Sequence, residues 1–116
     1  MRRNKYGNRK TIYNGVKFDS KKEAEYCMLL DQLKSAVDPE ERVERYELQP
    51  SFLLQEAFED KNGEKHRKIE YRADFHVFYS SGMEEIVDVK GMKTDIYRLK
   101  KKLLLFKYPK INFKEV

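Results

Sequence analysis

Two aspartates near the middle of the chain have the spacing of a divalent-metal site. Asp74 lies in the apolar segment 69–79 and Asp88 in the segment 85–90, with the turn residues 80–82 between them. A hairpin centred near Ser81 places the two aspartates nearly opposite each other on neighbouring strands. Paired carboxylates repel unless a cation lies between them, and oxygen ligands alone suit Mg²⁺ or Mn²⁺. The spacing therefore predicts a Mg²⁺ (or Mn²⁺) site.

Two further residues are candidates for this site. Lys90 follows Asp88 by two residues, so the two side chains leave a strand on the same face. Glu23 lies within roughly 40° of the centre of the apolar stripe of a predicted helix, where an acid needs a partner. Each has a simpler explanation: Asp88 and Lys90 form an ordinary cross-strand ion pair, and Glu23 completes a capping box with Ser20.

Local signals predict the elements that position these residues. Asn14-Gly15 predicts a tight hairpin between strands at 11–13 and 16–18. A helix should follow from Ser20 to about Ala36, with an apolar stripe at Tyr26, Leu30, Leu33 and Val37.

The rest of the chain alternates between strands and one more helix. Strands are expected at 46–54, interrupted near Pro50, then at 69–79 and 85–90, with a turn at 61–63. The helix should span 94–107 before a last strand at 111–116. The residues expected to share its buried face are Ile96, Leu99, Leu103 and Phe106. This order predicts an α/β fold with a single mixed β-sheet flanked by helices.

Length and composition limit the class of protein. The 116 residues fit one domain, 1–116, in which 1–10 read as a flexible basic arm. No apolar run approaches the roughly 20 residues that span a bilayer, so we expect no membrane partner and a cytoplasmic location. One cysteine excludes an internal disulfide framework and a Cys-based zinc cluster, and two histidines exclude a His-rich metal site.

The charge pattern predicts a nucleic-acid partner. Residues 1–22 and 90–110 each carry eight Lys or Arg against one acid, whereas the rest of the chain is acidic. Two basic blocks on an acidic body favour contact with a polyanion, although Lys-rich stretches also occur as solvated helix faces. The residues expected to contact DNA are Arg2, Arg3, Lys5, Arg9, Lys10, Lys93, Lys100 and Lys101.

Four stretches carry a resemblance to a known superfamily. They read NKYGNRKTIYNGVKFDSKKEAEY, ELQPSF, YRADF and VDVKGMKTDIYRLKKKLL. Together they resemble the PD-(D/E)xK nucleases, and more narrowly a family of small phage-encoded proteins that is grouped as a domain of unknown function and related to Holliday junction resolvases. The resemblance implies a restriction-endonuclease-like core. One departure is Ala73, which stands where the motif has proline.

The resemblance also implies a role for each candidate residue. Asp74 and Asp88 would ligate the metal, and Glu23 would complete the metal site. Lys90 would orient the attacking water and stabilise charge on the phosphate. Gln49 would support the site through its amide.

These expectations combine into one function. The chain is predicted to be a metal-dependent DNA endonuclease that acts on branched DNA, like a Holliday junction resolvase, during phage replication, recombination or packaging in the bacterial cytoplasm. A four-way junction has two equivalent strands to cut, which predicts a homodimer. Two alternatives stay open: a DNA-binding module without turnover on the nuclease fold, and a phage-encoded protein–protein adaptor.

Overall fold

The computed structural model describes residues 10–89 and 93–116, and its contacts divide the chain into two units. The first unit takes the chain up to Tyr46 together with Val77–Met83. The second unit consists of Glu47–His76 and Glu84–Val116. The strands β3 (Val43–Leu48) and β8 (Phe75–Tyr79) each run from one unit into the other.

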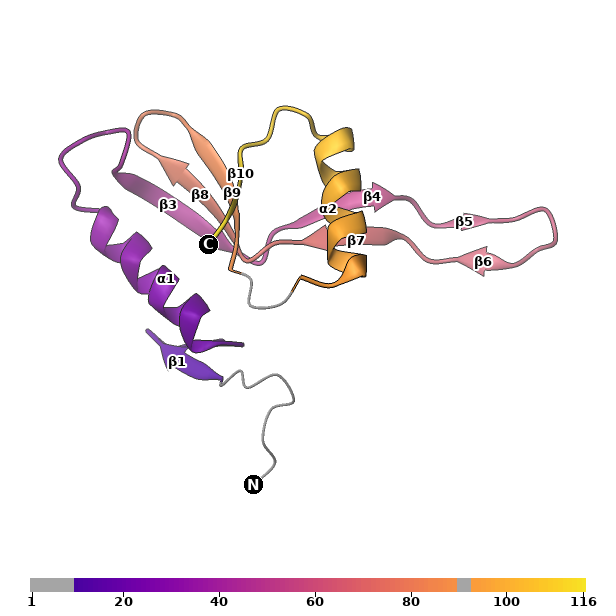
Figure 1. The fold of residues 1–116 in the computed structure, drawn as a ribbon, viewed down its shortest axis with the longest axis horizontal. Coiled ribbons are helices and arrows are strands. Elements are labelled where there is room, and N and C mark those ends of the chain that lie inside the picture. The colour runs from indigo at the N-terminus through magenta and orange to yellow at the C-terminus, as the bar shows by residue number, and fades with distance from the viewer. Residues whose placement is uncertain (1–9, 90–92) are drawn as a thin grey trace, which may run out of the picture. The chain divides into compact units, whose positions relative to one another are not determined.

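The first unit begins with the predicted hairpin. Strands β1 (Thr11–Tyr13) and β2 (Val16–Phe18) pair antiparallel, and Asn14 and Gly15 both have positive φ angles, 52° and 81°. This is the backbone of a type I′ turn, which Asn-Gly adopts with little strain. The hairpin contacts the following helix, α1 (Lys21–Leu33) (Figure 1). The hairpin prediction is therefore confirmed.

Helix α1 begins as predicted and ends earlier. The Ser20 side chain accepts a hydrogen bond from the Glu23 backbone at 3.1 Å, which caps the first turn. After Leu33 the chain tightens, because the backbone N–H groups of residues 34–36 donate to carbonyls three residues back. The buried residues are Ala24, Cys27 and Leu30, whereas Val37 lies beyond the helix and is 93% exposed. The predicted stripe is thus wrong at its C-terminal end.

Two long predicted strands are each broken, and the breaks lie side by side. The first divides into β3 and β4 (Ser51–Gln55), and the second into β7 (Ile69–Arg72) and β8. At the first break Gln49 has a φ angle of 50°, and Pro50 has no N–H to donate. The Gln49 N–H donates to the Asp74 carbonyl (3.0 Å), and the Ala73 N–H donates to the Pro50 carbonyl (3.0 Å). The bend therefore places Asp74 where the strand changes direction.

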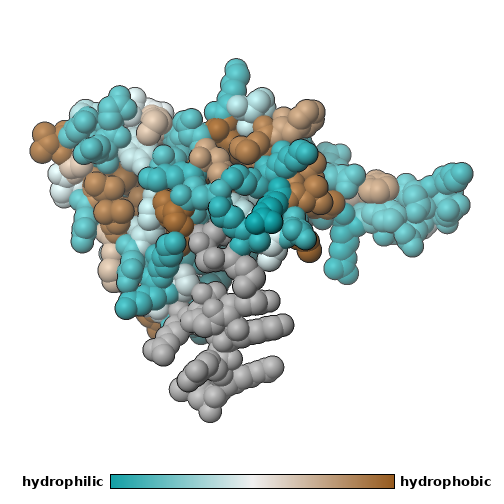
Figure 2. Space-filling view, viewed as in Figure 1, coloured by the Kyte–Doolittle hydropathy of each residue, from teal (hydrophilic) through white to brown (hydrophobic). Residues whose placement is uncertain are grey.

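Beyond these breaks, the chain forms a long two-stranded arm. Strand β4 pairs antiparallel with β7, with a bulge between Leu53 and Gln55. The arm continues into β5 (Phe58–Glu59) and β6 (Lys65–His66), which pair around the turn at 60–64. The turn at Gly63, with a φ angle of 83°, was predicted, and the strands flanking it were not. Figure 2 shows that hydrophilic residues cover most of this hairpin.

The remaining strands form a mixed sheet. Its order is β10-β9-β8-β3, with β9 spanning Glu84–Asp88 and β10 spanning Phe113–Glu115. Strand β10 runs parallel to β9 and pairs Glu115 with Asp88. The described residues thus form an α/β fold with mainly antiparallel strands and two helices, which confirms the predicted fold class. Their strands divide into this mixed sheet and three two-stranded pairs.

Helix α2 (Asp95–Lys107) packs on β4 and β7 with a face that differs from the predicted one (Figure 1). Leu104 is fully buried against Tyr71, Ala73 and Ile86. The predicted face is exposed instead. Its members are Ile96 (68% exposed), Leu99 (58%), Leu103 (40%) and Phe106 (87%).

A second apolar stripe explains the error. Tyr97, Leu104 and Tyr108 recur at i, i+7 and i+11 on the other side of the helix. The Tyr108 hydroxyl also donates to the Leu53 carbonyl at 2.9 Å, and its ring packs edge-on against Phe52. Aromatic burial with a satisfied hydroxyl therefore outcompetes the aliphatic stripe. Neither helix in the described part of the chain has the length and apolar character to span a membrane.

Candidate active site

The segments that carry Asp74 and Asp88 meet inside the second unit. Asp74 lies in the bend between β7 and β8, and Asp88 is the last residue of β9. The backbone N–H of Asp74 donates to the Val87 carbonyl at 3.1 Å, which joins the bend to β9. Both aspartates therefore lie where regular strand pairing ends, and their side chains accept backbone hydrogen bonds there.

The two carboxylates are held by reciprocal hydrogen bonds. The Asp74 N–H also donates to Oδ1 of Asp88 (3.1 Å), and the Val89 N–H donates to Oδ2 of Asp74 (2.7 Å). Each carboxylate thus accepts from the backbone of the segment that carries the other. The prediction that the two aspartates lie opposite each other is confirmed.

Asp88 is an ionisable side chain in the protein core. It is 0% exposed, and its neighbours Val87 and Val89 are buried as well. The hydroxyl of Tyr71 donates a short hydrogen bond to Oδ2 of Asp88. Tyr71 is itself 2% exposed, and its ring packs edge-on against Phe113 at a centroid distance of 6.0 Å. Packing therefore fixes the donor that this buried carboxylate requires.

A third carboxylate, which the sequence reasoning missed, lies on the neighbouring strand. Glu115 of β10 is in register with Asp88, and residues in register on parallel strands project to the same face. Its carboxylate pairs with Lys93 at 3.3 Å and with Lys101 through a short hydrogen bond. Lys101 above all lowers the pKa of Glu115 to about 2, so this carboxylate is ionised at neutral pH.

The pKa of the Tyr97 phenol reflects both burial and these negative charges. Burial raises its pKa, and the carboxylates of Glu115, Asp88 and Asp74 raise it further. Tyr97 therefore stays protonated at neutral pH beside the acidic cluster. Its ring lies 6.2 Å from that of Tyr71, so the two tyrosines flank the same region.

The donor set fits a divalent cation that prefers oxygen ligands. Asp74 and Asp88 offer carboxylate oxygens whose positions are fixed by the hydrogen bonds described above. An ionised carboxylate has about four acceptor positions, so Asp88 can accept two hydrogen bonds and still bind an ion. No imidazole or thiolate belongs to this pair, which favours Mg²⁺ or Mn²⁺ over softer ions.

One comparison with known proteins found a match. A family model described as "Protein of unknown function (DUF1064)" matches residues 3–116, nearly the whole chain. The chain belongs to the DUF1064 family. Searches of curated proteins and of solved structures each found no match. The family assignment names no chemistry, so the nuclease function stays a prediction.

In this DUF1064 chain, the predicted DNA-contacting lysines of the second unit have different surroundings. Lys93 is exposed, whereas Lys101 is half-buried, and both pair with Glu115. Lys100 is half-buried and lines a hollow of about 340 Å³ together with Tyr71 and Arg72. Two cations and one acid, Glu70, therefore border this hollow, and Tyr71 links it to Asp88.

Gln49 contributes through its backbone. Its N–H donates to the Asp74 carbonyl, and Gln49 itself is exposed. A positive φ angle at a residue other than glycine is uncommon and costs about 1 kcal/mol or more. The strained backbone of Gln49 thus helps to position Asp74, and the predicted contact of its amide with the site stays a prediction.

Glu23 lies in the first unit, apart in the chain from the aspartate pair. It is a half-buried residue in the first turn of α1, and its N–H completes the cap with Ser20. At about 100° per residue it lies near the buried side that Ala24, Cys27 and Leu30 define. The Ser20 half of the capping box is therefore confirmed, and a ligand role for the Glu23 side chain stays a prediction.

Several predicted residues fall outside the described part of the DUF1064 chain. Lys90 lies in the segment 90–92, directly after Val89. The predicted DNA contacts Arg2, Arg3, Lys5 and Arg9 also lie outside it, whereas Lys10 is described and exposed. The roles predicted for these side chains stay predictions.

Proposed function

We propose that this chain is a metal-dependent DNA endonuclease of the PD-(D/E)xK type that cuts branched DNA. The observation that carries the proposal is the reciprocal hydrogen bonding of Asp74 and Asp88, which holds two carboxylates together at the ends of neighbouring strands. Two carboxylates in such proximity favour a bound cation, since their mutual repulsion opposes the folded state without one. The motif resemblance supplies the reaction class.

Each candidate residue would have a distinct role in the reaction. Asp74 and Asp88 would hold Mg²⁺, and the motif resemblance implies Glu23 as a third ligand. When bound, Mg²⁺ withdraws charge from a phosphoryl oxygen and makes water a stronger nucleophile at neutral pH. Lys90 orients that water and stabilises the negative charge that develops on the phosphate.

Cations on the second unit would position the DNA backbone. Arg72 and Lys100 border the hollow beside Tyr71, and a phosphate lying there would be close to the residue that holds Asp88. The basic N-terminal segment adds further phosphate contacts. Binding through such contacts weakens steeply with salt concentration.

A homodimer would match the symmetry of a four-way junction. The exposed apolar face of α2, formed by Ile96, Leu99, Leu103 and Phe106, supports this part of the proposal, because contiguous exposed apolar residues are typical of interaction surfaces. We place the dimer contact on this face. Sedimentation of Phe106→Asp, with Lys102→Asp as the control on the same helix, tests the placement. A Phe106→Asp chain that sediments like the unsubstituted dimer would contradict it.

One observation favours the alternative of a DNA-binding module without turnover. Both carboxylate oxygens of Asp88 already accept a hydrogen bond, one from Tyr71 and one from the Asp74 backbone. In a purely structural cluster these bonds would be sufficient. The module and the enzyme differ in whether the bound DNA is cut.

Cleavage of a labelled four-way junction separates the two functions. The reactions contain Mg²⁺, Mn²⁺ or EDTA, with linear duplex and flap DNA as substrate controls. Asp74→Asn and Asp88→Asn are compared with Asp95→Asn, an exposed acid of the same unit whose removal should leave cleavage unchanged. Metal-dependent cuts that are lost only in the first two variants support the enzyme. Salt-sensitive binding without cutting in either metal would refute it and leave the binding module.

A further inference from the structure

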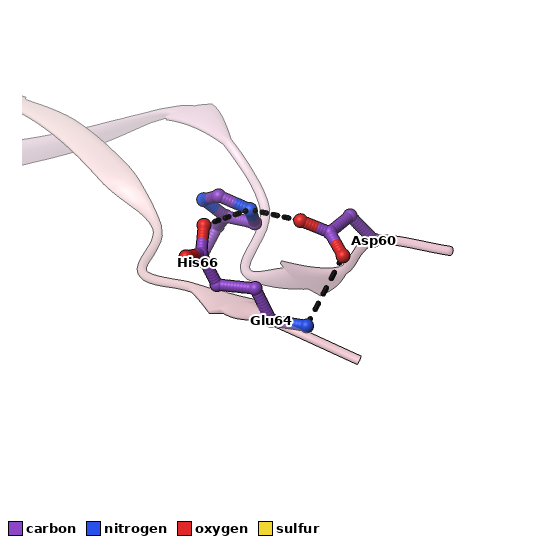
Figure 3. Close-up of side chains that lie close together, drawn as sticks. All are labelled: Asp60, Glu64 and His66. Carbon is purple, nitrogen blue, oxygen red and sulfur yellow. Dashed lines mark hydrogen bonds and ion pairs between the residues drawn. The ribbon is translucent and has the colours of Figure 1, made fainter. Parts of the chain in front are cut away.

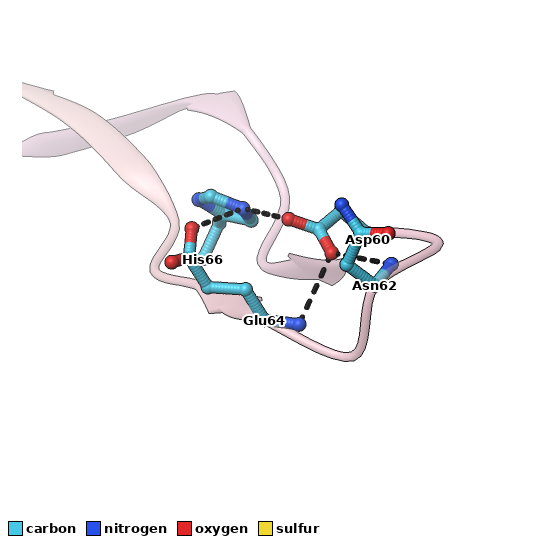
Figure 4. A network of polar contacts seen from close by, with 4 residues as sticks. All are labelled: Asp60, Asn62, Glu64 and His66. Atoms are coloured by element: carbon cyan, nitrogen blue, oxygen red, sulfur yellow. Dashed lines mark hydrogen bonds and ion pairs between the residues drawn. The ribbon is translucent and has the colours of Figure 1, made fainter.

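A second cluster of ligating side chains lies at the tip of the β5–β6 hairpin. The turn 60–64 is closed by Asp60, whose Oδ1 accepts hydrogen bonds from the backbones of Asn62 (2.8 Å) and Glu64 (3.1 Å) (Figure 4). The Asp60 N–H donates in turn to the Glu64 carbonyl at 2.9 Å. These bonds use one carboxylate oxygen of Asp60 and leave Oδ2 directed at another partner.

That partner is an imidazole nitrogen which two carboxylates approach together. Nε2 of His66 lies 2.9 Å from Oδ2 of Asp60 and 3.2 Å from Oε2 of Glu64 (Figure 3). All three ligand atoms lie within 4.8 Å of one another. A neutral imidazole has one N–H at most on this nitrogen, so a single proton is shared between two acceptors.

The separations of these atoms match those around a small metal ion. Zinc binds imidazole nitrogen and carboxylate oxygen at roughly 2.0–2.2 Å. Two ligands at that distance are roughly 3.4 Å apart in a tetrahedral site and roughly 3.0 Å apart at adjacent positions of an octahedron, by simple trigonometry. The separations of 2.9 and 3.2 Å fall near this range. The imidazole nitrogen and each carboxylate oxygen are therefore already separated as two ligands of one ion would be.

The surrounding residues hold the ligands in a suitable state. The His66 ring stacks on Phe58 at a centroid distance of 4.7 Å and an interplanar angle of 18°. Glu64 is exposed at 72% of its side chain, so water can complete the coordination on that side. The ring is thus oriented before any ion arrives.

We propose that Asp60, Glu64 and His66 bind a divalent transition-metal ion, for which Zn²⁺ is the probe. One imidazole nitrogen with two carboxylates favours Zn²⁺ and its first-row neighbours over Mg²⁺, which prefers oxygen ligands alone. The site is separate in sequence from Asp74 and Asp88, and the inference does not depend on the nuclease proposal. Sequence reasoning missed it because the ligands meet only once β5 and β6 pair.

The chain provides a matched control in its other histidine. Nε2 of His76 lies 2.9 Å from Glu84, the same separation as in the His66–Asp60 pair. If a close carboxylate were enough to bind zinc, both histidines would respond alike.

Zinc titration of the full chain, followed through the two histidine ring signals by NMR, tests the site. We expect the His66 signals to shift and saturate near one equivalent of Zn²⁺, while those of His76 stay unchanged at the same concentrations. Asp60→Asn keeps the oxygen that closes the turn and removes the charge, so it should weaken binding at least about tenfold with the hairpin intact. Glu64→Gln should act in the same direction, and Mg²⁺ should not shift the His66 signals.

Three results would overturn the proposal. The first is a His66 signal that does not move with Zn²⁺. The second is parallel movement of His66 and His76, which would indicate weak binding to any exposed histidine. The third is an unchanged zinc affinity in both Asp60→Asn and Glu64→Gln, with backbone amide signals showing that the hairpin is still formed.

Discussion

Removing the Tyr71 hydroxyl group tests whether its hydrogen bond to Asp88 stabilises the fold. The substitution Tyr71→Phe deletes the donor to Oδ2 of Asp88 and leaves the ring in place, so the packing against Phe113 is kept. Asp88 then remains 0% exposed with one of its hydrogen bonds unmade. The free energy of unfolding should therefore fall by more than the loss of an ordinary hydrogen bond.

The size of the effect follows from burial and charge. A hydrogen bond to a charged group contributes about 1.5–3 kcal/mol, whereas one between neutral groups contributes about 0.5–1.5 kcal/mol. Tyr108→Phe provides the neutral comparison, because the Tyr108 hydroxyl donates to the Leu53 carbonyl in the same unit. We expect Tyr71→Phe to lose about 1 kcal/mol more stability than Tyr108→Phe.

Urea unfolding at neutral pH measures this difference. The two variants and the unsubstituted chain are compared in EDTA and again in Mg²⁺, with the denaturant slope serving as the check that the same surface unfolds. The extra loss in Tyr71→Phe should shrink in Mg²⁺, because a bound cation compensates the carboxylate. Equal losses in Tyr71→Phe and Tyr108→Phe, with unchanged slopes, would refute the view that Tyr71 stabilises a buried charge.

Two further predictions concern Glu115 and the packing of α2. Lys101 lowers the pKa of Glu115 from 4.5 to about 2, so the unsubstituted chain should be more stable than Glu115→Gln above about pH 4.5 and lose that advantage as the pH falls toward 2. Urea unfolding at several pH values measures this difference in stability. A difference that does not change with pH would contradict the ion pair. Leu104→Ala should lower the free energy of unfolding by about 2–5 kcal/mol because it leaves a cavity. Leu105→Ala, at an exposed position of the same helix outside the proposed dimer face, should cost much less. Equal losses would contradict the observed orientation of the helix.

Features with a local signal were predicted from the sequence. Asn14-Gly15 specifies its turn because the positive φ angles depend on those two residues alone. Ser20 caps the first helix by accepting a hydrogen bond from the Glu23 backbone three residues on. The opposition of Asp74 and Asp88 followed from counting residues on each side of a short turn. In all these cases the interacting groups are close in sequence or joined by one turn.

Features that depend on distant partners were not predicted. Helix α2 carries two apolar stripes, and only the strands β4 and β7 decide that Leu104 rather than Leu103 is buried. Glu115 joins Asp88 through parallel pairing, which periodicity does not reveal. The bend at Gln49 depends on a hydrogen bond to Asp74, a residue far along the chain.

Stability alone does not explain the placement of Asp88. Its neighbours Ile86, Val87 and Val89 are buried and apolar, and stability alone would favour an apolar residue at position 88 as well, since burying a carboxylate is unfavourable even when it is hydrogen-bonded. The chain instead supplies the Tyr71 hydroxyl and the Asp74 backbone to hold the charge there. Glu115 differs, because lysines pair with it and its ionised form favours folding. A carboxyl group kept in the core at a cost, beside a second one, is what the proposed metal site would require.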